Sequence, residues 1–172
     1  CTFDVNQNLK KRLDELCSES EIAVREGTKH LVLTDKFISE KKAPVPMALA
    51  IGAINSRLSD AGIRGFTSIN VQTSEALDTH SFAVLLGVGA TTINSYIAFD
   101  SIYQRYEKGL FGKISFEECI NRYVKSIDNG LLKIMSKMGI SVLSAYRGGC
   151  NFEAVGLSRS FVTKYFPGMI SR

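Results

Sequence analysis

The segment whose residue types most suggest chemistry is a glycine turn near the end of the chain. It reads Tyr146, Arg147, Gly148, Gly149, Cys150 and Asn151. Two adjacent glycines let backbone amides approach a phosphate or carboxylate closely, and Arg147 adds a planar fork of N–H donors. The turn lacks the Lys-Ser/Thr of a P-loop and the spacing of a G-x-G-x-x-G fingerprint. Two interpretations follow: an anion or small-molecule site using the turn from Arg147 to Asn151, or a structural turn in which Arg147 pairs with a carboxylate of a neighbouring domain.

Four cysteines, Cys1, Cys17, Cys119 and Cys150, offer thiol or metal chemistry. None forms the C-x-x-C pair typical of zinc sites, iron–sulfur clusters or redox dithiols. Cys17 and Cys119 fall within apolar helical patterns, which favours core packing. Cys150 is expected beside a helix N-terminus, which favours the thiolate, but no acid or base adjoins it in sequence. We therefore predict no catalytic, cofactor-binding or metal-binding residue in this chain.

An N-terminal cysteine can act as a nucleophile with its own amine as the base. Here Cys1 leads directly into Thr2, Phe3 and Asp4, which is typical of a strand already under way. The pattern favours a piece excised from a longer chain over a catalytic N-terminus. His30 at the start of a predicted strand and His80 at the start of a predicted helix are expected to be structural or solvent-facing.

The elements that would position the glycine turn are a long helix and a short strand. Ser115 and Glu118 have capping-box spacing, and apolar residues recur at helical intervals over residues 116–138. Gly130 interrupts this helix and predicts a kink or two consecutive helices. The apolar run at 141–145 predicts a buried parallel strand. The turn would then lie at the carboxyl end of a strand and open another helix, where α/β folds usually meet ligands.

The rest of the chain alternates predicted strands and helices. Helices are expected at residues 8–26, 46–62, 79–86, 98–106 and 158–165, and strands at 30–33, 66–71 and 91–94. The strand at 30–33 is expected to be buried on both faces. Polar residues follow two strands, at 34–35 and 72–75, and the second group is placed to face a cleft. The alternation predicts an α/β fold of repeated βα units with a mainly parallel sheet, partial barrel-like, as a single domain over residues 1–172.

Composition excludes several classes of protein. The chain has 172 residues, 45% of them hydrophobic, and a formal net charge of +4. Its basic residues are interspersed with acidic ones instead of forming a stripe, which argues against nucleic-acid binding. No apolar run reaches the length of about 18–20 residues that crosses a membrane, and the N-terminus lacks the pattern of a secretory signal. We therefore expect no nucleic-acid or membrane partner and a cytoplasmic location.

Five separated motifs resemble the central domain of the glutamate synthase large subunit. They are LVLTD at 31–35, APVPMALAIGAI at 43–54, LLGVGATTINSYIAF at 85–99, GLLKIMSKMGIS at 130–141 and YRGGCNFEAVGL at 146–157. The motifs fall in the family's order and cover nearly the whole chain. The resemblance implies the C-terminal portion of that central domain, with the first part missing.

What the resemblance implies is a role without a complete active site. In the family, a glutaminase domain releases ammonia, which travels through a tunnel to an FMN-bearing synthase domain that makes glutamate from 2-oxoglutarate. The central domain connects the two and helps to wall the tunnel. FMN and an iron–sulfur cluster are thus implied for the parent enzyme and none for this fragment. The partners implied are the glutaminase and FMN synthase domains of the same polypeptide.

The glycine turn departs from the family pattern. The family often has Ala-Gln-Ile where this chain has Gly149, Cys150 and Asn151, so the Cys150 thiol inherits no role. The residues we single out there, as an interdomain or anion contact, are Tyr146, Arg147, Gly148, Gly149 and Asn151. The alternative to the scaffold role is a stand-alone α/β module that binds an anion or small molecule with the turn from Arg147 to Asn151.

Overall fold

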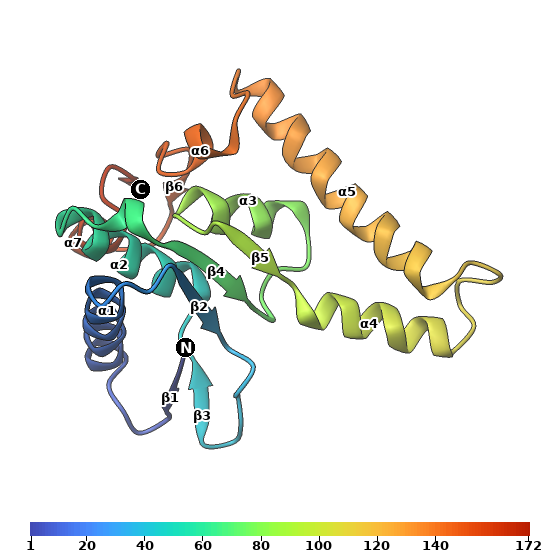
Figure 1. The fold of residues 1–172 in the computed structure, drawn as a ribbon, viewed down its shortest axis with the longest axis horizontal. Helices are drawn as coiled ribbons and strands as arrows, with labels where there is room; N and C mark the ends of the chain where they lie inside the picture. Colours follow the sequence, from blue (N-terminus) through green and yellow to red (C-terminus); the bar gives the residue numbers. More distant parts are fainter.

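A computed structural model describes all residues, 1–172, as an α/β fold around a parallel sheet (Figure 1). That sheet has the order β2-β4-β5, formed by His30–Thr34, Ser68–Gln72 and Thr92–Asn94. Two small sheets flank it: antiparallel β1-β3 (Thr2–Asp4 and Lys42–Pro44) and parallel β6-β7 (Glu153–Ala154 and Ile170–Ser171). The mainly parallel α/β class is confirmed, and the sheet does not close into a barrel.

Seven helices accompany the strands. They are α1 (Leu9–Arg25), α2 (Met47–Asp60), α3 (Thr79–Gly87), α4 (Tyr96–Glu107), α5 (Phe116–Lys137), α6 (Leu143–Tyr146) and α7 (Arg159–Tyr165), with a 3-10 turn η1 at Arg64–Phe66. The five helices predicted outside the glycine-turn region are therefore confirmed. Several begin at a side-chain cap: Asn8, Asp78, Ser115 and Ser158 each accept a backbone N–H of the first turn.

Helix α2 lies at the centre of the core. Its apolar residues occur on nearly every side, and Ala50, Ile51, Ile54 and Leu58 are all fully buried. They pack with inward-facing residues of the sheet such as Ile69, which is also fully buried. Burying a side chain of this size contributes about 1.5–3 kcal/mol, so α2 and the sheet form the main stabilising layer pair.

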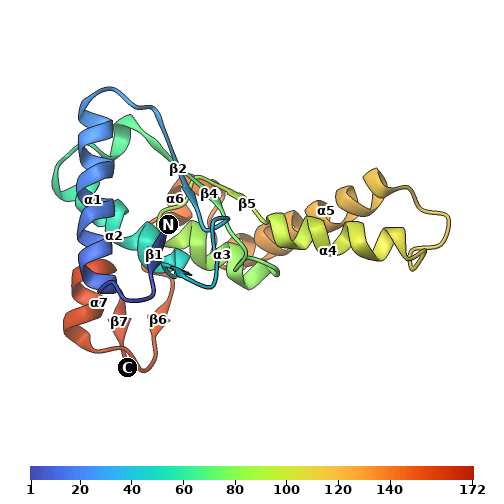
Figure 2. The same ribbon diagram turned by 90° about the horizontal axis from the view of Figure 1, so that it is seen from below.

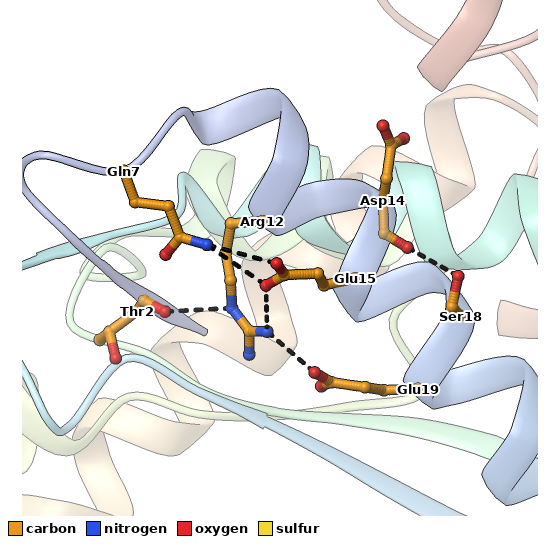
Figure 3. A network of polar contacts seen from close by, with 7 residues as sticks. All are labelled: Thr2, Gln7, Arg12, Asp14, Glu15, Ser18 and Glu19. Atoms are coloured by element: carbon orange, nitrogen blue, oxygen red, sulfur yellow. Dashed lines mark hydrogen bonds and ion pairs between the residues drawn. The ribbon is translucent and has the colours of Figure 1, made fainter.

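Helix α1 is tied to strand β1 by Arg12 (Figure 3). Its Nε donates to the backbone oxygen of Thr2 at 3.3 Å, and its Nη1 contacts Glu15 at 3.2 Å and Glu19 at 2.9 Å. The guanidinium thus links the helix surface to the strand beneath it. This contact holds the antiparallel pair of β1 and β3 against the body of the fold.

One face of the parallel sheet carries no helix, which corrects the prediction for residues 30–33. Along β2 burial alternates, so Leu31 and Leu33 are buried whereas His30 and Val32 are exposed, Val32 by 65%. In Figure 2, α2 and α3 lie on one side of the sheet and the other side is open. The prediction of burial on both faces was wrong because the chain's own helices cover only one of them.

Helix α5 runs without interruption through Gly130, as one helix instead of two consecutive ones. Together with α4 it forms an arm that projects from the rest of the fold (Figures 1 and 2). At its start, Ser115 Oγ accepts the backbone N–H of Glu118, but the Glu118 carboxylate contacts Arg122 instead of completing the capping box. Gly130 has a packing role, because it meets Thr79 at the start of α3.

The predicted strand at 141–145 is wrong. Residues Leu143–Tyr146 form the short helix α6, which buries Tyr146 in a second apolar cluster with Ala83, Leu86 and Met135. A short apolar run is equally compatible with a buried helical turn, and here no neighbouring strand is available for pairing. The residues after Tyr146 do not open a helix either, because α7 begins only at Arg159. None of the helices is both long and apolar enough to span a membrane.

Candidate functional site

Polar residues gather where the three parallel strands end. Asp35 follows β2, Thr73 and Ser74 follow β4, and Tyr96 begins α4 just beyond β5. The carboxyl ends of parallel strands share one edge of a sheet, so these side chains meet although they are far apart in the sequence. The polar groups at 34–35 and 72–75 are thereby brought together.

Asp35 is the centre of this cluster. Its side chain is fully buried and accepts hydrogen bonds from Thr73 Oγ1 at 2.7 Å, Ser74 N at 2.9 Å, Ser74 Oγ at 3.0 Å and Tyr96 Oη at 3.0 Å. Burial and then the bond to Asp35 raise the pKa of Tyr96, which keeps its phenol a donor. An ionised carboxylate is acceptor-only and matches four donors well. Asp35 therefore clamps the ends of β2 and β4 and the start of α4.

Glu75 extends the cluster to helix α2. Its Oε2 accepts the backbone N–H of Met47 at 3.0 Å, at a helix start where Pro46 supplies no side-chain cap. Burial of part of the side chain raises the pKa of Glu75, the Met47 bond opposes this, and the charge of Asp35 adds to it. Glu75 acts as a remote cap that joins the strand-end edge to the core helix.

The glycine turn does not lie at this edge of the sheet. The prediction that it follows the carboxyl end of a strand is therefore wrong. Gly148 N donates to the backbone oxygen of Gly87 at the end of α3, 2.9 Å away. Asn151 Nδ2 and Gly149 N both donate to the backbone oxygen of Tyr146, at 3.1 and 3.3 Å. The turn thus packs near the residues that precede β5, not at the carboxyl edge of the sheet. No strand leads into it and no helix starts from it, so the anion-binding geometry expected from a βα turn is not present.

Arg147 of the turn lines a pocket together with a second arginine, Arg64, which the sequence analysis did not single out. A pocket of about 340 Å³ is lined by Asn55, Ser59, Arg64, Gly65, Gly89, Arg147 and Gly148. Arg64 donates to Asn55 Oδ1 at 2.7 Å, to Thr67 O at 2.6 Å and to Gly89 O at 2.9 Å. Burial and then the charge of Arg147 lower the pKa of Arg64. The only sequence signal for Arg64 was its place between two glycines before a strand.

The four cysteines and two histidines differ in their burial and contacts. All four thiols are free, Cys119 is buried in its helix as expected, and Cys17 packs partly buried against the main core. Cys150 is exposed in a left-handed backbone conformation, with φ of 52°, and does not adjoin a helix N-terminus. His30 Nδ1 lies 2.8 Å from Ser68 Oγ, and His80 packs edge-on against Phe152. No three potential metal ligands of the His, Cys, Asp and Glu types gather in the fold.

The family profile and the similar proteins that match this chain all belong to one family. The sequence profile described as "Glutamate synthase central domain" matches residues 1–158. The glutamate synthase [NADPH] large chain of Azospirillum brasilense is 52% identical over 174 residues, which cover 99% of this chain and 12% of that protein. The same large chain of Bacillus subtilis (strain 168) is 40% identical over 167 residues, covering 97% of this chain and 11% of that protein.

A ferredoxin-dependent relative agrees with these two. The chloroplastic enzyme of Spinacia oleracea is 38% identical over 187 residues, covering 99% of this chain and 11% of its own length. The chain therefore spans about one eighth to one ninth of the relatives it matches, at 11–12% of their length. Since the profile match takes in all of the elements from β1 to β6, the chain belongs to the glutamate synthase central domain family.

Proposed function

We propose that this chain is a non-catalytic scaffold within a glutamate synthase, connecting a glutaminase domain to an FMN synthase domain. The parent enzyme would make glutamate from glutamine and 2-oxoglutarate, with FMN and an iron–sulfur cluster held by other parts of the polypeptide. The relatives are glutamate synthases of both NADPH- and ferredoxin-dependent types, and each is about eight to nine times longer than the matched segment. A segment of this size in such a protein works beside much more polypeptide.

The observation that carries the proposal is the open face of the parallel sheet. Parallel sheets are ordinarily covered on both faces, because their strands are buried by crossover helices. Here the helices cover one face, and Val32 stands 65% exposed on the other. That face is a surface suited to another domain of the same polypeptide.

Several polar side chains of the open face are already paired with one another. Asn70 Nδ2 donates to Ser68 Oγ at 2.9 Å, Thr92 Oγ1 donates to Asn70 Oδ1 at 2.7 Å, and Thr34 Oγ1 donates to Gln72 Oε1 at 2.9 Å. A neighbouring domain can cover polar groups at small cost when their hydrogen bonds are already satisfied. The ladder across β2, β4 and β5 therefore suits a surface that is covered in the assembled enzyme.

The α4–α5 arm offers a second contact surface. It projects from the rest of the fold (Figure 1), and it exposes Tyr103 by 50%, Leu110 by 66% and Leu132 by 62%. These large apolar side chains are spread along the projecting arm, from α4 through the connecting loop to α5, and we propose that a neighbouring domain covers some of them. The arm and the open sheet face would let the chain hold two other domains at a fixed separation.

A fixed separation matters for the chemistry of the parent enzyme. Ammonia that escapes to water is protonated and is no longer a nucleophile, so its path between two active sites needs walls that exclude bulk water. The Asp35 clamp makes the carboxyl edge of the sheet rigid by joining three elements. We place this edge, and the loops around it, among the segments that help to wall the ammonia path.

Coupling between the two reactions in the full-length enzyme tests the proposal. Val32→Glu puts a charge on the open face, and Ile22→Glu is a matched control on helix α1, where Ile22 is 57% exposed. The scaffold role predicts that Val32→Glu keeps glutamine hydrolysis but lowers the glutamate formed per glutamine consumed, whereas Ile22→Glu keeps both. Unchanged coupling in Val32→Glu, in an enzyme that binds its FMN normally, would remove the open face from the interface and overturn the proposal.

A further inference from the structure

Arg64 and Arg147 lie on segments more than eighty residues apart in the sequence and line one pocket. We infer that they form a receptor for a single carboxylate, supplied in the parent enzyme by an Asp or Glu side chain of a neighbouring domain. The source of that carboxylate rests on the scaffold role proposed above. The chemistry of the receptor rests only on this chain's own residues.

The first support is a buried donor without an acceptor. Arg147 Nε is the one buried side-chain nitrogen or oxygen in the chain that lacks a hydrogen-bond partner. Leaving such a donor unpaired costs about 1–3 kcal/mol, and more for a charged group. Folded proteins pair nearly all buried polar atoms, so the unpaired Nε–H shows that the Arg147 guanidinium, which belongs to a residue lining the pocket, lacks an acceptor within this chain.

The second support is the charge around the pocket. Neither Arg64 nor Arg147 belongs to any of the ion pairs of the chain, and no acidic residue lines the pocket. Two guanidinium groups that share a pocket repel each other, and the charge of Arg147 indeed acts to lower the pKa of Arg64. An anion bound between the two guanidinium groups would attract both of them and offset this repulsion.

The third support is the fixed geometry of Arg64. Its Nε, Nη1 and Nη2 each donate to a protein oxygen, on Asn55, Thr67 and Gly89. A guanidinium has five N–H groups, so these three bonds hold the plane of the group while one N–H on each terminal nitrogen stays available. A rigid fork loses little entropy when it binds a carboxylate, which matches its two parallel donors.

Binding of acetate to the 172-residue chain tests the receptor without any other domain. The ¹⁵N–¹H signals of the arginine Nε groups are followed while sodium acetate replaces sodium chloride at constant ionic strength. We expect a saturable shift of the Arg147 and Arg64 signals with acetate and none specific to chloride. Arg147→Gln should weaken acetate binding about tenfold, the effect of losing one charge-assisted hydrogen bond.

Two further variants separate the fork from simple charge. Arg147→Lys keeps the charge but loses the planar fork, and should bind acetate more weakly than the unaltered chain. Arg159→Gln, which removes an exposed arginine at the start of α7, should leave acetate binding unchanged. Melting curves establish that each variant is folded, and Arg64 is left intact because its three hydrogen bonds also support the fold.

Three results would overturn the carboxylate receptor. Acetate binding that survives Arg147→Gln, or that chloride matches at equal ionic strength, overturns it. Inorganic phosphate that binds more than tenfold tighter than acetate would assign the pocket to a phosphate and overturn the carboxylate receptor. Because acetate is measured on this chain alone, loss of the scaffold role in the Val32→Glu experiment would leave the result on the receptor unaffected.

Discussion

Gly130, in the middle of helix α5, lies directly against Thr79, the first residue of helix α3. A Cβ added to Gly130 would come within 2.5 Å of both Cγ2 and Oγ1 of Thr79. The glycine therefore sets how closely the α4–α5 arm approaches the body of the fold. Helix α5 is otherwise a regular amphipathic helix, so this contact is the reason that glycine stands in its interior.

We predict that Gly130→Ala destabilises the chain. In an exposed helix the substitution would stabilise by about 1 kcal/mol, because alanine is the better helix former. Here the added methyl group overpacks the contact with Thr79, at a cost of about 1–3 kcal/mol. Chemical denaturation measures the change in the free energy of unfolding.

A double-mutant cycle with Thr79→Ala isolates the contact. Thr79→Ala removes Cγ2 and Oγ1, so the double variant should recover most of the stability that Gly130→Ala loses. If the two substitutions are simply additive, the close approach of α5 to α3 is not what determines the effect of the glycine.

We predict that Asp35→Asn lowers the free energy of unfolding by roughly 2–3 kcal/mol, as expected for lost hydrogen bonds to a charged group. The asparagine amide would turn an N–H group toward the donors of Thr73, Ser74 and Tyr96, which now all point at one carboxylate. Asp4→Asn is the control, since Asp4 is exposed and its side chain lies outside this network. Equal effects of the two substitutions would show that Asp35 does not clamp the sheet edge.

The helices and the parallel strands could be predicted from the sequence because their signals are local. Periodic apolar residues and polar caps such as Ser158 depend only on a few neighbours, and those elements are confirmed. The apolar run at 141–145 failed because a short apolar segment suits a strand or a buried helical turn equally. Pairing to a neighbouring strand decides between them, and pairing is a long-range property.

The candidate site was harder to predict for the same reason. The polar ends of β2 and β4 could be predicted to share an edge, since parallel strands end together, and Asp35 does meet Thr73 there. The meeting of Arg64 with Arg147 depends on how the end of the chain folds back over α3, which no local pattern encodes. The open face of β2 was missed because a strand's apolar residues do not reveal which partner covers them.

We predict that Arg147→Gln in the full-length enzyme lowers the glutamate formed per glutamine consumed, while glutamine hydrolysis itself continues. The expected reason is the loss of the carboxylate contact that we infer between Arg147 and a neighbouring domain. Stopped assays that quantify free ammonia beside glutamate measure the coupling. Arg159→Gln serves as the control, and coupling that is equal in the two variants would mean that Arg147 is not an interdomain contact.

The stability of the chain should also depend on pH through Glu75. Partial burial raises the pKa of Glu75 above its ordinary value of 4.5. At pH values between the ordinary pKa and the raised one, the folded state therefore binds more protons than the unfolded state. Stability then falls as pH rises through this window. The slope should be shallow, because Glu75 keeps an exposed edge and accepts the Met47 N–H, which favours the ionised form.

The variant Glu75→Gln tests whether the Glu75 carboxyl group carries this pH dependence. The glutamine oxygen can still accept the Met47 N–H, and the side chain no longer ionises, so the decline in stability above the ordinary carboxylate pKa should flatten. Glu40→Gln, at an exposed position of the β2–β3 loop, is the matched control and should leave the profile unchanged. Urea denaturation at a series of pH values from mildly acidic to neutral measures both. A Glu75→Gln profile that runs parallel to that of the unaltered chain would mean that another carboxylate carries the pH dependence, and that the link from the sheet edge to α2 does not depend on the charge of Glu75.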